Sequence, residues 1–171
     1  PVVQGMIQRI QPAENVERVM NQSRDLGYCS VNIDLVYGLP KQTIQSVSLT
    51  FDEVLKWKPD RIAFYSYAHI PWIKPGMRKF TEADLPSAPE KRALYDYGRA
   101  RLEEAGYLEI GMDHFALASD PLYHAFQNKK LHRNFMGYST TNTPLLIGLG
   151  VSAISDSFTA FAQNEKTVED Y

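Results

Sequence analysis

The chain has 171 residues, of which 44% are apolar and 22% are charged, and its formal net charge is −2. This length and composition predict an ordinary globular domain with a hydrophobic core. The small net charge excludes a strongly basic surface for nucleic acid or an anionic membrane, and no apolar run is long enough to span a bilayer. We therefore expect a soluble, cytoplasmic protein that binds neither nucleic acid nor membrane.

The first half of the chain has the rhythm of parallel βα units. Helices are predicted over residues 12–26 and 43–57, and short apolar strands follow them over residues 30–36 and 61–67. In folds built from such units, ligands collect at the C-terminal ends of the strands. The ends of these two strands are therefore the first place where we expect functional residues.

The second half has a different character. Residues 70–86 are rich in proline and charge, which predicts an excursion over the surface. Ser87 with Glu90 three residues later forms a capping box that opens a helix, and Gly106 closes it. The remaining predicted elements, in chain order, are a strand over 107–111, a loop over 112–116, a short helix over 121–130, and strands over 131–138 and 145–151.

Two features suggest that these residues belong to a longer polypeptide. The chain begins at Pro1 without a start methionine, and it stops at Tyr171 in what reads as a helix. We therefore expect an excerpt of a longer protein. Cys29 is the single cysteine, so the chain alone forms no disulfide and builds no thiolate metal or cluster site. It precedes an apolar strand, which favours a buried packing residue over a catalytic thiol.

Asp34 is the sharpest local signal for a ligand site. It is the one charge in the apolar run over residues 31–36, at what we expect to be the mouth end of a parallel strand. A buried carboxylate requires partners. These are either backbone N–H groups of its own loop or the hydroxyl and amino donors of a ligand. For Arg9, which lies between apolar neighbours, a solvated side chain is favoured over a carboxylate clamp.

Other polar and glycine positions give weaker signals. The four histidines lack the spacing of metal ligands, so no histidine metal site is expected. His114 follows a predicted strand, where a structural role is favoured over an acid or base. Gly148 and Gly150 lie two apart in an apolar segment, which indicates either close approach of the backbone to a planar ligand or tight strand packing.

Read in order, several blocks resemble the coproporphyrinogen oxidase branch of the radical SAM enzymes. The block NIDLVYGLPKQT is shared with heme-chaperone relatives of these oxidases, whereas GMDHFA and LHRNF look like the oxidase itself. The resemblance covers essentially the whole chain. The matching blocks are residues 32–43, 59–61, 67–69, 111–116, 131–135 and 149–155.

The resemblance implies an α/β fold: the C-terminal half of a partial (βα)6 barrel over residues 1–80, then the start of an α+β C-terminal domain over residues 81–171. It also implies the oxidative decarboxylation of two propionates of coproporphyrinogen III, giving protoporphyrinogen IX for heme synthesis. The family uses a 4Fe-4S cluster and two S-adenosylmethionine molecules, and an electron donor protein. The alternative is a heme-chaperone relative that binds heme without decarboxylation, and a binding domain without a cluster is a third possibility.

The resemblance also suggests ligand contacts, position by position. Arg9 and Asp34 look like contacts to the second S-adenosylmethionine, and Ala68 and Ile154 look like contacts to the first. Phe135 would lie near the same cavity. At the next position Met136 stands where well-known members carry glutamine, so a polar contact is lost or replaced there.

The cysteine motif that binds the cluster in this family is absent from these residues, which limits their activity in isolation. The three-cysteine loop that holds the cluster lies upstream in the family, and Cys29 cannot replace it. We expect the excerpt to be inactive by itself and the parent enzyme to be a monomer. A half-barrel leaves one strand edge unpaired, so the excerpt is expected to pair with another copy or to aggregate.

Overall fold

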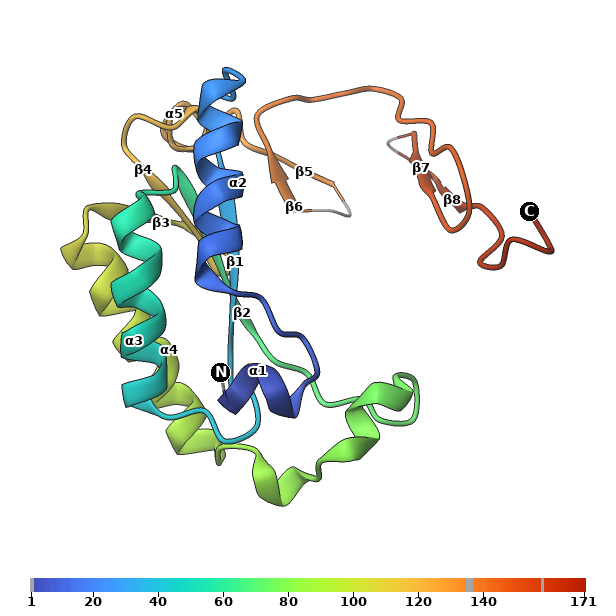
Figure 1. Ribbon diagram of the computed structural model, residues 1–171. Coiled ribbons are helices and arrows are strands. Elements are labelled where there is room, and N and C mark those ends of the chain that lie inside the picture. The colour runs from blue at the N-terminus through green and yellow to red at the C-terminus, as the bar shows by residue number, and fades with distance from the viewer. Residues whose placement is uncertain (1, 135–136, 158) are drawn as a thin grey trace. The chain divides into compact units, whose positions relative to one another are not determined.

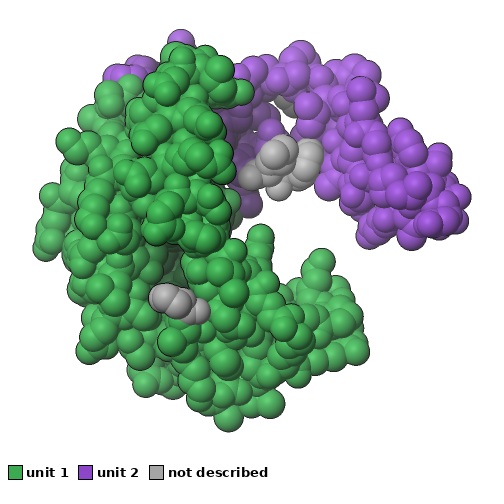
Figure 2. Space-filling view, viewed as in Figure 1, with its two compact units in different colours: residues 1–123 green, residues 124–171 purple. Residues whose placement is uncertain are grey.

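The computed structural model describes residues 2–134, 137–157 and 159–171. The chain forms two compact units, Pro1–Tyr123 and His124–Tyr171 (Figure 2). Residues 81–123 therefore pack with the residues before them in this chain. The division into residues 1–80 and 81–171 stays a prediction about the domains of a longer protein.

The first unit is built on a four-stranded sheet with the order β1-β2-β4-β3 (Figure 1). β1 (Asn32–Tyr37) and β2 (Arg61–Ser66) are parallel, as predicted, and α3 (Ile44–Val54) with the short 3-10 helix Leu55–Trp57 connects them. The hairpin of β3 (Tyr107–Gly111) and β4 (His114–Leu117) extends this sheet in the antiparallel direction. The architecture is therefore α/β, with a mixed sheet.

One face of the sheet forms the core with two helices. Side chains of α3 and of α4 (Ala88–Glu104) pack against alternate residues of the strands. The capping box predicted for α4 is present, since the Ser87 N–H donates to Glu90 Oε2 at 2.8 Å. The buried members of this core are Val47, Phe51, Val54, Ile62, Phe64, Leu94, Leu102, Tyr107 and Phe115.

The opposite face of the sheet carries Asp34 and other polar residues beside the buried Ala63. Strand pairing places Asp34 beside Ala63 and Ala63 beside His114, so these three residues form one row across three strands. Residues two apart in a strand share a face. Asn32, Val36 and Tyr65 therefore lie on this side as well, and we call it the Asp34 face.

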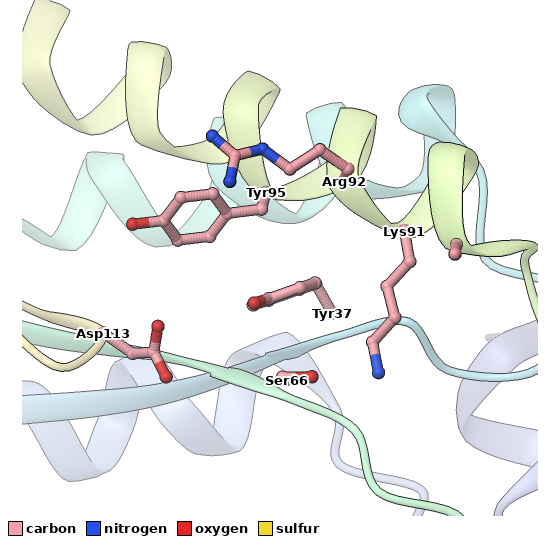
Figure 3. A pocket seen from close by; sticks show the side chains of 7 residues that line it. Tyr37, Ser66, Lys91, Arg92, Tyr95 and Asp113 are labelled. Atoms are coloured by element: carbon pink, nitrogen blue, oxygen red, sulfur yellow. The ribbon is translucent and has the colours of Figure 1, made fainter.

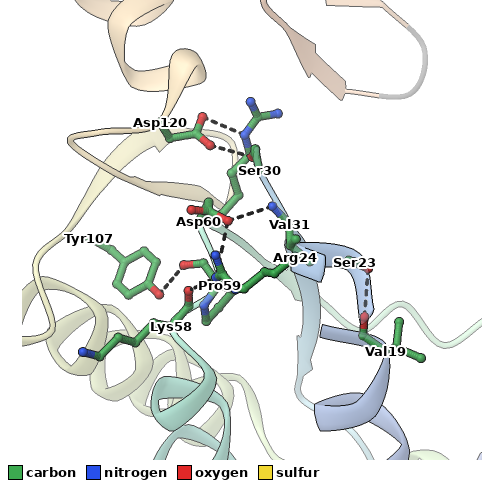
Figure 4. A network of polar contacts seen from close by, with 11 residues as sticks. Val19, Ser23, Arg24, Ser30, Val31, Lys58, Pro59, Asp60, Tyr107 and Asp120 are labelled. Carbon is green, nitrogen blue, oxygen red and sulfur yellow. Dashed lines mark hydrogen bonds and ion pairs between the residues drawn. The ribbon is translucent and has the colours of Figure 1, made fainter. Parts of the chain in front are cut away.

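A network of polar contacts lies at the N-terminal ends of β1 and β2 (Figure 4). The buried Asp120 carboxylate accepts hydrogen bonds from Arg61 Nε at 2.7 Å and from Ser30 Oγ at 2.6 Å. It also accepts the Leu122 N–H at 2.6 Å, at the start of α5 (Pro121–Gln127). This carboxylate ties β2 to the segment before β1 and to α5.

Two helices precede the sheet, α1 (Val2–Met6) and α2 (Ala13–Asp25). Arg24, in the last turn of α2, donates from Nη2 to the Lys58 carbonyl at 2.6 Å and lies 3.6 Å from Asp60. Between β2 and α4, the predicted surface excursion holds two short 3-10 helices, Pro75–Lys79 and Glu82–Asp84. Within it, Phe80 is buried.

The second unit contains two small hairpins. β5 (His132–Asn134) pairs with β6 (Gly137–Ser139), and β7 (Ile154–Asp156) pairs with β8 (Phe161–Gln163). Within the described part of the chain, no helix is both long and apolar enough to cross a membrane.

Several predicted elements were wrong. Residues 112–116 were expected to be a loop, but β4 begins at His114, because pairing with β2 extends the chain there. The single strand expected over residues 131–138 was also wrong, because its described residues belong to two strands, β5 up to Asn134 and β6 from Gly137. Residues 145–151 form no strand beyond a bridge at Leu146, and the chain ends in bends and turns rather than a helix.

Candidate functional site

Asp34 is exposed and lies in the middle of β1, not at its end. The sequence-based expectation of a buried carboxylate at the strand mouth was wrong. The strict alternation of the strand sends Ile33 and Leu35 into the core and sends Asp34 to the other side. The Asn32 amide donates to Asp34 Oδ1 at 2.6 Å. The carboxylate is therefore solvated, oriented by one neighbour, and accessible to a ligand.

Aromatic groups flank Asp34 on the same face. Tyr65 lies across from Val36, and its ring and the His114 ring are nearly perpendicular, with a centroid distance of 5.9 Å. Burial raises the pKa of the Tyr65 phenol, and the charges of Asp34 and Asp113 raise it further. His114 Nδ1 lies 2.7 Å from the Met112 carbonyl, which can only accept, so the proton sits on Nδ1. The face thus offers a carboxylate, a protonated phenol and an oriented imidazole.

Ala68 lies two residues beyond the end of β2 and is exposed. The Tyr67 N–H donates to the Tyr37 carbonyl at 2.8 Å, which continues the parallel pairing to this point. Asp34 pairs with Ala63, so Ala68 lies five residues further along β2, roughly 16 Å in an extended chain. The two positions therefore lie at the middle and beyond the C-terminal end of neighbouring parallel strands.

The other residues predicted to contact a ligand lie outside this sheet. Arg9 is exposed in the segment between α1 and α2, where its N–H donates to the Gln4 carbonyl at 3.0 Å. Ile154 begins β7 in the second unit. Phe135 and Met136 lie outside the described residues. A Cβ at Gly148 would lie 2.8 Å from the Ile154 backbone, which supports tight packing as the reason for that glycine.

A cavity of about 470 Å³ opens beside the C-terminal ends of β1 and β2, on the side of α4 (Figure 3). Its polar lining includes Lys91 from α4 and Asp113 from the β3–β4 turn. Burial raises the pKa of Asp113, with Glu109 adding to the shift and His114 opposing it. No local pattern in the sequence indicated Lys91, because it is one of many charged residues in its helix. The full lining is Tyr37, Ser66, Ala88, Lys91, Arg92, Tyr95 and Asp113.

The chain does not fit an iron–sulfur cluster. Cys29 is the single cysteine, and it is exposed rather than buried as we expected, because it lies in the bend between α2 and β1. Within the described ranges, no three histidine, cysteine, aspartate or glutamate side chains come together as metal ligands. The described residues therefore supply no ligand set for a cluster.

Comparison with solved structures shows that the fold is similar to part of a radical SAM enzyme. The chain matches, with a TM-score of 0.93 and 44% sequence identity, a structure from Escherichia coli described as a radical SAM enzyme. The match covers 99% of this chain and 39% of the other. That protein is a coproporphyrinogen III oxidase.

Curated relatives carry the same activity in their names. The chain is 44% identical over 169 residues to the oxygen-independent coproporphyrinogen III oxidase of Helicobacter pylori and 41% identical to that of Synechocystis. These matches cover 99% of this chain but only 37% and 36% of the relatives. No family model matches. The resemblance inferred from the sequence blocks is confirmed, and the chain spans little more than a third of these relatives.

Proposed function

We propose that this chain is part of an oxygen-independent coproporphyrinogen III oxidase of heme biosynthesis, a radical SAM oxidoreductase. The observation that carries the proposal is the 44% identity over 99% of the chain, together with a TM-score of 0.93 to an oxidase of known structure. The complete protein would oxidatively decarboxylate two propionates of coproporphyrinogen III to vinyl groups, giving protoporphyrinogen IX.

The mixed sheet suits the second half of a partial (βα)6 barrel. β1 and β2 would be its last two parallel strands, and β1 lies at a sheet edge where a preceding strand can pair. The Asp34 face would then line the interior of the barrel, and the helices α3 and α4 would lie outside. Residues 81–171 would form the start of the family-specific C-terminal region.

The side chains of this segment would bind and orient two S-adenosylmethionine molecules. Asp34 supplies carboxylate acceptors for hydroxyl or amino donors of the second molecule, and the exposed Arg9 supplies a guanidinium for its carboxylate. Ala68 and Ile154 would contact the first molecule. The 4Fe-4S cluster would be held by another part of the complete protein, which would act in the cytoplasm with an electron donor protein.

The proposal is tested on the product of the complete open reading frame that contains these residues. The protein is purified and assayed anaerobically with coproporphyrinogen III, S-adenosylmethionine and a low-potential reductant, and protoporphyrinogen IX is measured. We expect product formation that requires S-adenosylmethionine, and none from the 171-residue chain alone. Heme retention without turnover by the complete protein would overturn the proposal.

A further inference from the structure

Lys91 joins the loops that follow both parallel strands. It lies in the first turns of α4, and its side chain extends along the cavity wall toward the strand ends (Figure 3). Its ammonium donates to the Tyr67 carbonyl at 2.6 Å, just beyond the end of β2. The Tyr67 N–H in turn bonds the Tyr37 carbonyl at the end of β1. One side chain of α4 is thus linked to both strand ends.

The methylene groups of Lys91 pack against Gly38 in the loop after β1. A Cβ at Gly38 would lie 2.6 Å from Lys91 Cε and 3.1 Å from Cγ, and the glycine has a φ of +82°. The same loop is held from a second side, since Lys41 Nζ lies 2.9 Å from Asp84 Oδ1. Lys91 therefore fills a space that only glycine leaves, and the position of its ammonium is determined by packing.

The bond from Lys91 acts on the peptide unit that contains the Ala68 N–H. The Tyr67 carbonyl and the Ala68 N–H belong to one trans peptide, in which the two groups point in opposite directions. The Ala68 N–H therefore points away from Lys91 and α4. In the described part of the chain this N–H has no hydrogen-bond partner. A cationic donor on the carbonyl also polarises the peptide and strengthens its N–H as a donor.

We propose that Lys91 is a positioning residue for S-adenosylmethionine: it orients and polarises the Tyr67–Ala68 peptide so that the Ala68 N–H donates to the bound nucleoside. This inference rests on the proposed function, because it takes the nucleoside to lie at Ala68. Lys91 does not contact the nucleoside itself, because it binds the carbonyl of the Tyr67–Ala68 peptide and the N–H points the other way. Its loss weakens the binding of S-adenosylmethionine without removing a group that contacts it.

The test compares Lys91→Met with the unaltered complete protein. Methionine keeps an unbranched apolar side chain to pack on Gly38 and removes the ammonium, so folding should be preserved. Lys56→Met is the matched control, because among the described residues Lys56 pairs only with the exposed Glu53, at 2.7 Å. We expect the KM and the Kd for S-adenosylmethionine to rise roughly tenfold in Lys91→Met, with little change in kcat, as for loss of uniform binding. The control should leave all three unchanged.

The outcomes separate the two proposals. If the unaltered protein neither binds S-adenosylmethionine nor forms protoporphyrinogen IX, the proposed function fails and this inference fails with it. If the unaltered protein is active and Lys91→Met has the same KM and Kd, only the inference is overturned. A lower melting temperature with an unchanged Kd would assign Lys91 to folding alone, which also overturns it. Lys91→Ala, which removes the packing as well, should raise the Kd at least as much.

Discussion

At the scale of single residues, the side chains of β1 point alternately to the two faces of the sheet. Its packing residues therefore lie on one face and its candidate ligand-binding residue on the other. Ile33 and Leu35 reach the core, and Asp34 between them reaches solvent on the other face. The desolvation free energy of an exposed carboxylate is small on folding. Asp34 therefore has little effect on stability, and its acceptor oxygens stay accessible. Side chains on the two faces of one strand can therefore be tested independently.

Asp34→Asn should weaken S-adenosylmethionine binding and leave stability unchanged. The amide removes the negative charge and one acceptor, so we expect the Kd of the complete protein to rise about tenfold. The melting temperature should not change, because among the described residues the Asp34 side chain bonds only to the exposed Asn32. Equilibrium dialysis and thermal denaturation measure the two effects, with Glu53→Gln as an exposed carboxylate control. An unchanged Kd would remove Asp34 from the proposed site.

Tyr107 should make the chain sensitive to alkaline pH. Its side chain is 3% exposed, its hydroxyl donates to the Pro59 carbonyl at 2.5 Å, and burial, aided by Asp60, raises its pKa to about 12 from 10.0. The folded state therefore binds the proton more tightly than the unfolded state. This contribution is complete below pH 10 and is lost as pH rises to about 12, at about 1.4 kcal/mol for each pH unit.

Tyr107→Phe should remove this contribution. Urea denaturation at pH 9 and pH 11 measures it, and the free energy of unfolding should fall less between these pH values in the variant than in the unaltered chain. At pH 7 the variant should be about 1–3 kcal/mol less stable, because the buried Pro59 carbonyl loses its donor. Equal pH dependence in both proteins would contradict the assignment.

At the scale of elements, the close approach of α4 to the sheet depends on Gly98. A Cβ there would lie 2.3 Å from Phe64 Cε1 and 3.0 Å from Phe51 Cε2, and both rings are almost fully buried. Helix propensity alone favours alanine over glycine by about 1 kcal/mol. Packing opposes this preference, since neither ring can move without disturbing the core.

Gly98→Ala should therefore destabilise the chain. We expect a loss of about 1–3 kcal/mol in the free energy of unfolding, as for other overpacked cores. The control is Gly5→Ala in α1, where no atom lies within 4 Å of an added Cβ. Chemical denaturation measures both variants, and a gain in stability from Gly98→Ala would show that the helix does not lie against Phe64.

The link between β2 and α5 depends on Asp120. Its side chain is fully buried and accepts hydrogen bonds from Arg61, Ser30 and the Leu122 N–H. Asp120→Ala leaves the Arg61 guanidinium without its anion, and we expect a loss of about 3–5 kcal/mol. Breaking the exposed Arg99–Glu103 pair with Glu103→Gln should have no measurable effect. Similar melting temperatures for both variants would contradict this difference.

At the scale of the whole molecule, the sheet ends on an exposed strand. β1 pairs with β2 on one side and lies at the edge of the four-stranded sheet on the other. Asn32, Asp34 and Val36 of this edge strand are exposed, and Val36 adds an apolar surface. Unpaired strand edges recruit other chains, so the isolated chain has a site for association through β1.

The isolated 171-residue chain should associate in a concentration-dependent way, and Val36→Lys should reduce this association. A charge on an edge strand opposes edge-to-edge pairing. Sedimentation velocity over a range of protein concentrations measures the effect. Leu149→Lys is the control, because it adds a charge at an exposed apolar position in the second unit. If both variants associate equally, β1 is not the contact.

The sequence by itself determined the elements whose signals are local. Periodicity and capping located the helices near residues 13–25, 44–54 and 88–104, and apolar runs located β1 and β2. Short sequence blocks, read in order, resembled the oxidase family, and the comparisons confirm that resemblance. These features depend on residues close together in the chain, so they can be predicted without knowledge of the tertiary contacts.

The tertiary structure alone decided which distant residues meet. β4 is a strand because it pairs with β2, about fifty residues earlier, and its short loop-like sequence does not reveal this partner. The exposure of Asp34 follows from which face the helices cover, and Lys91 reaches Tyr67 only because α4 packs beside the strand ends. Burial and long-range hydrogen bonds are properties of the packed chain, since they depend on surfaces that no local pattern contains.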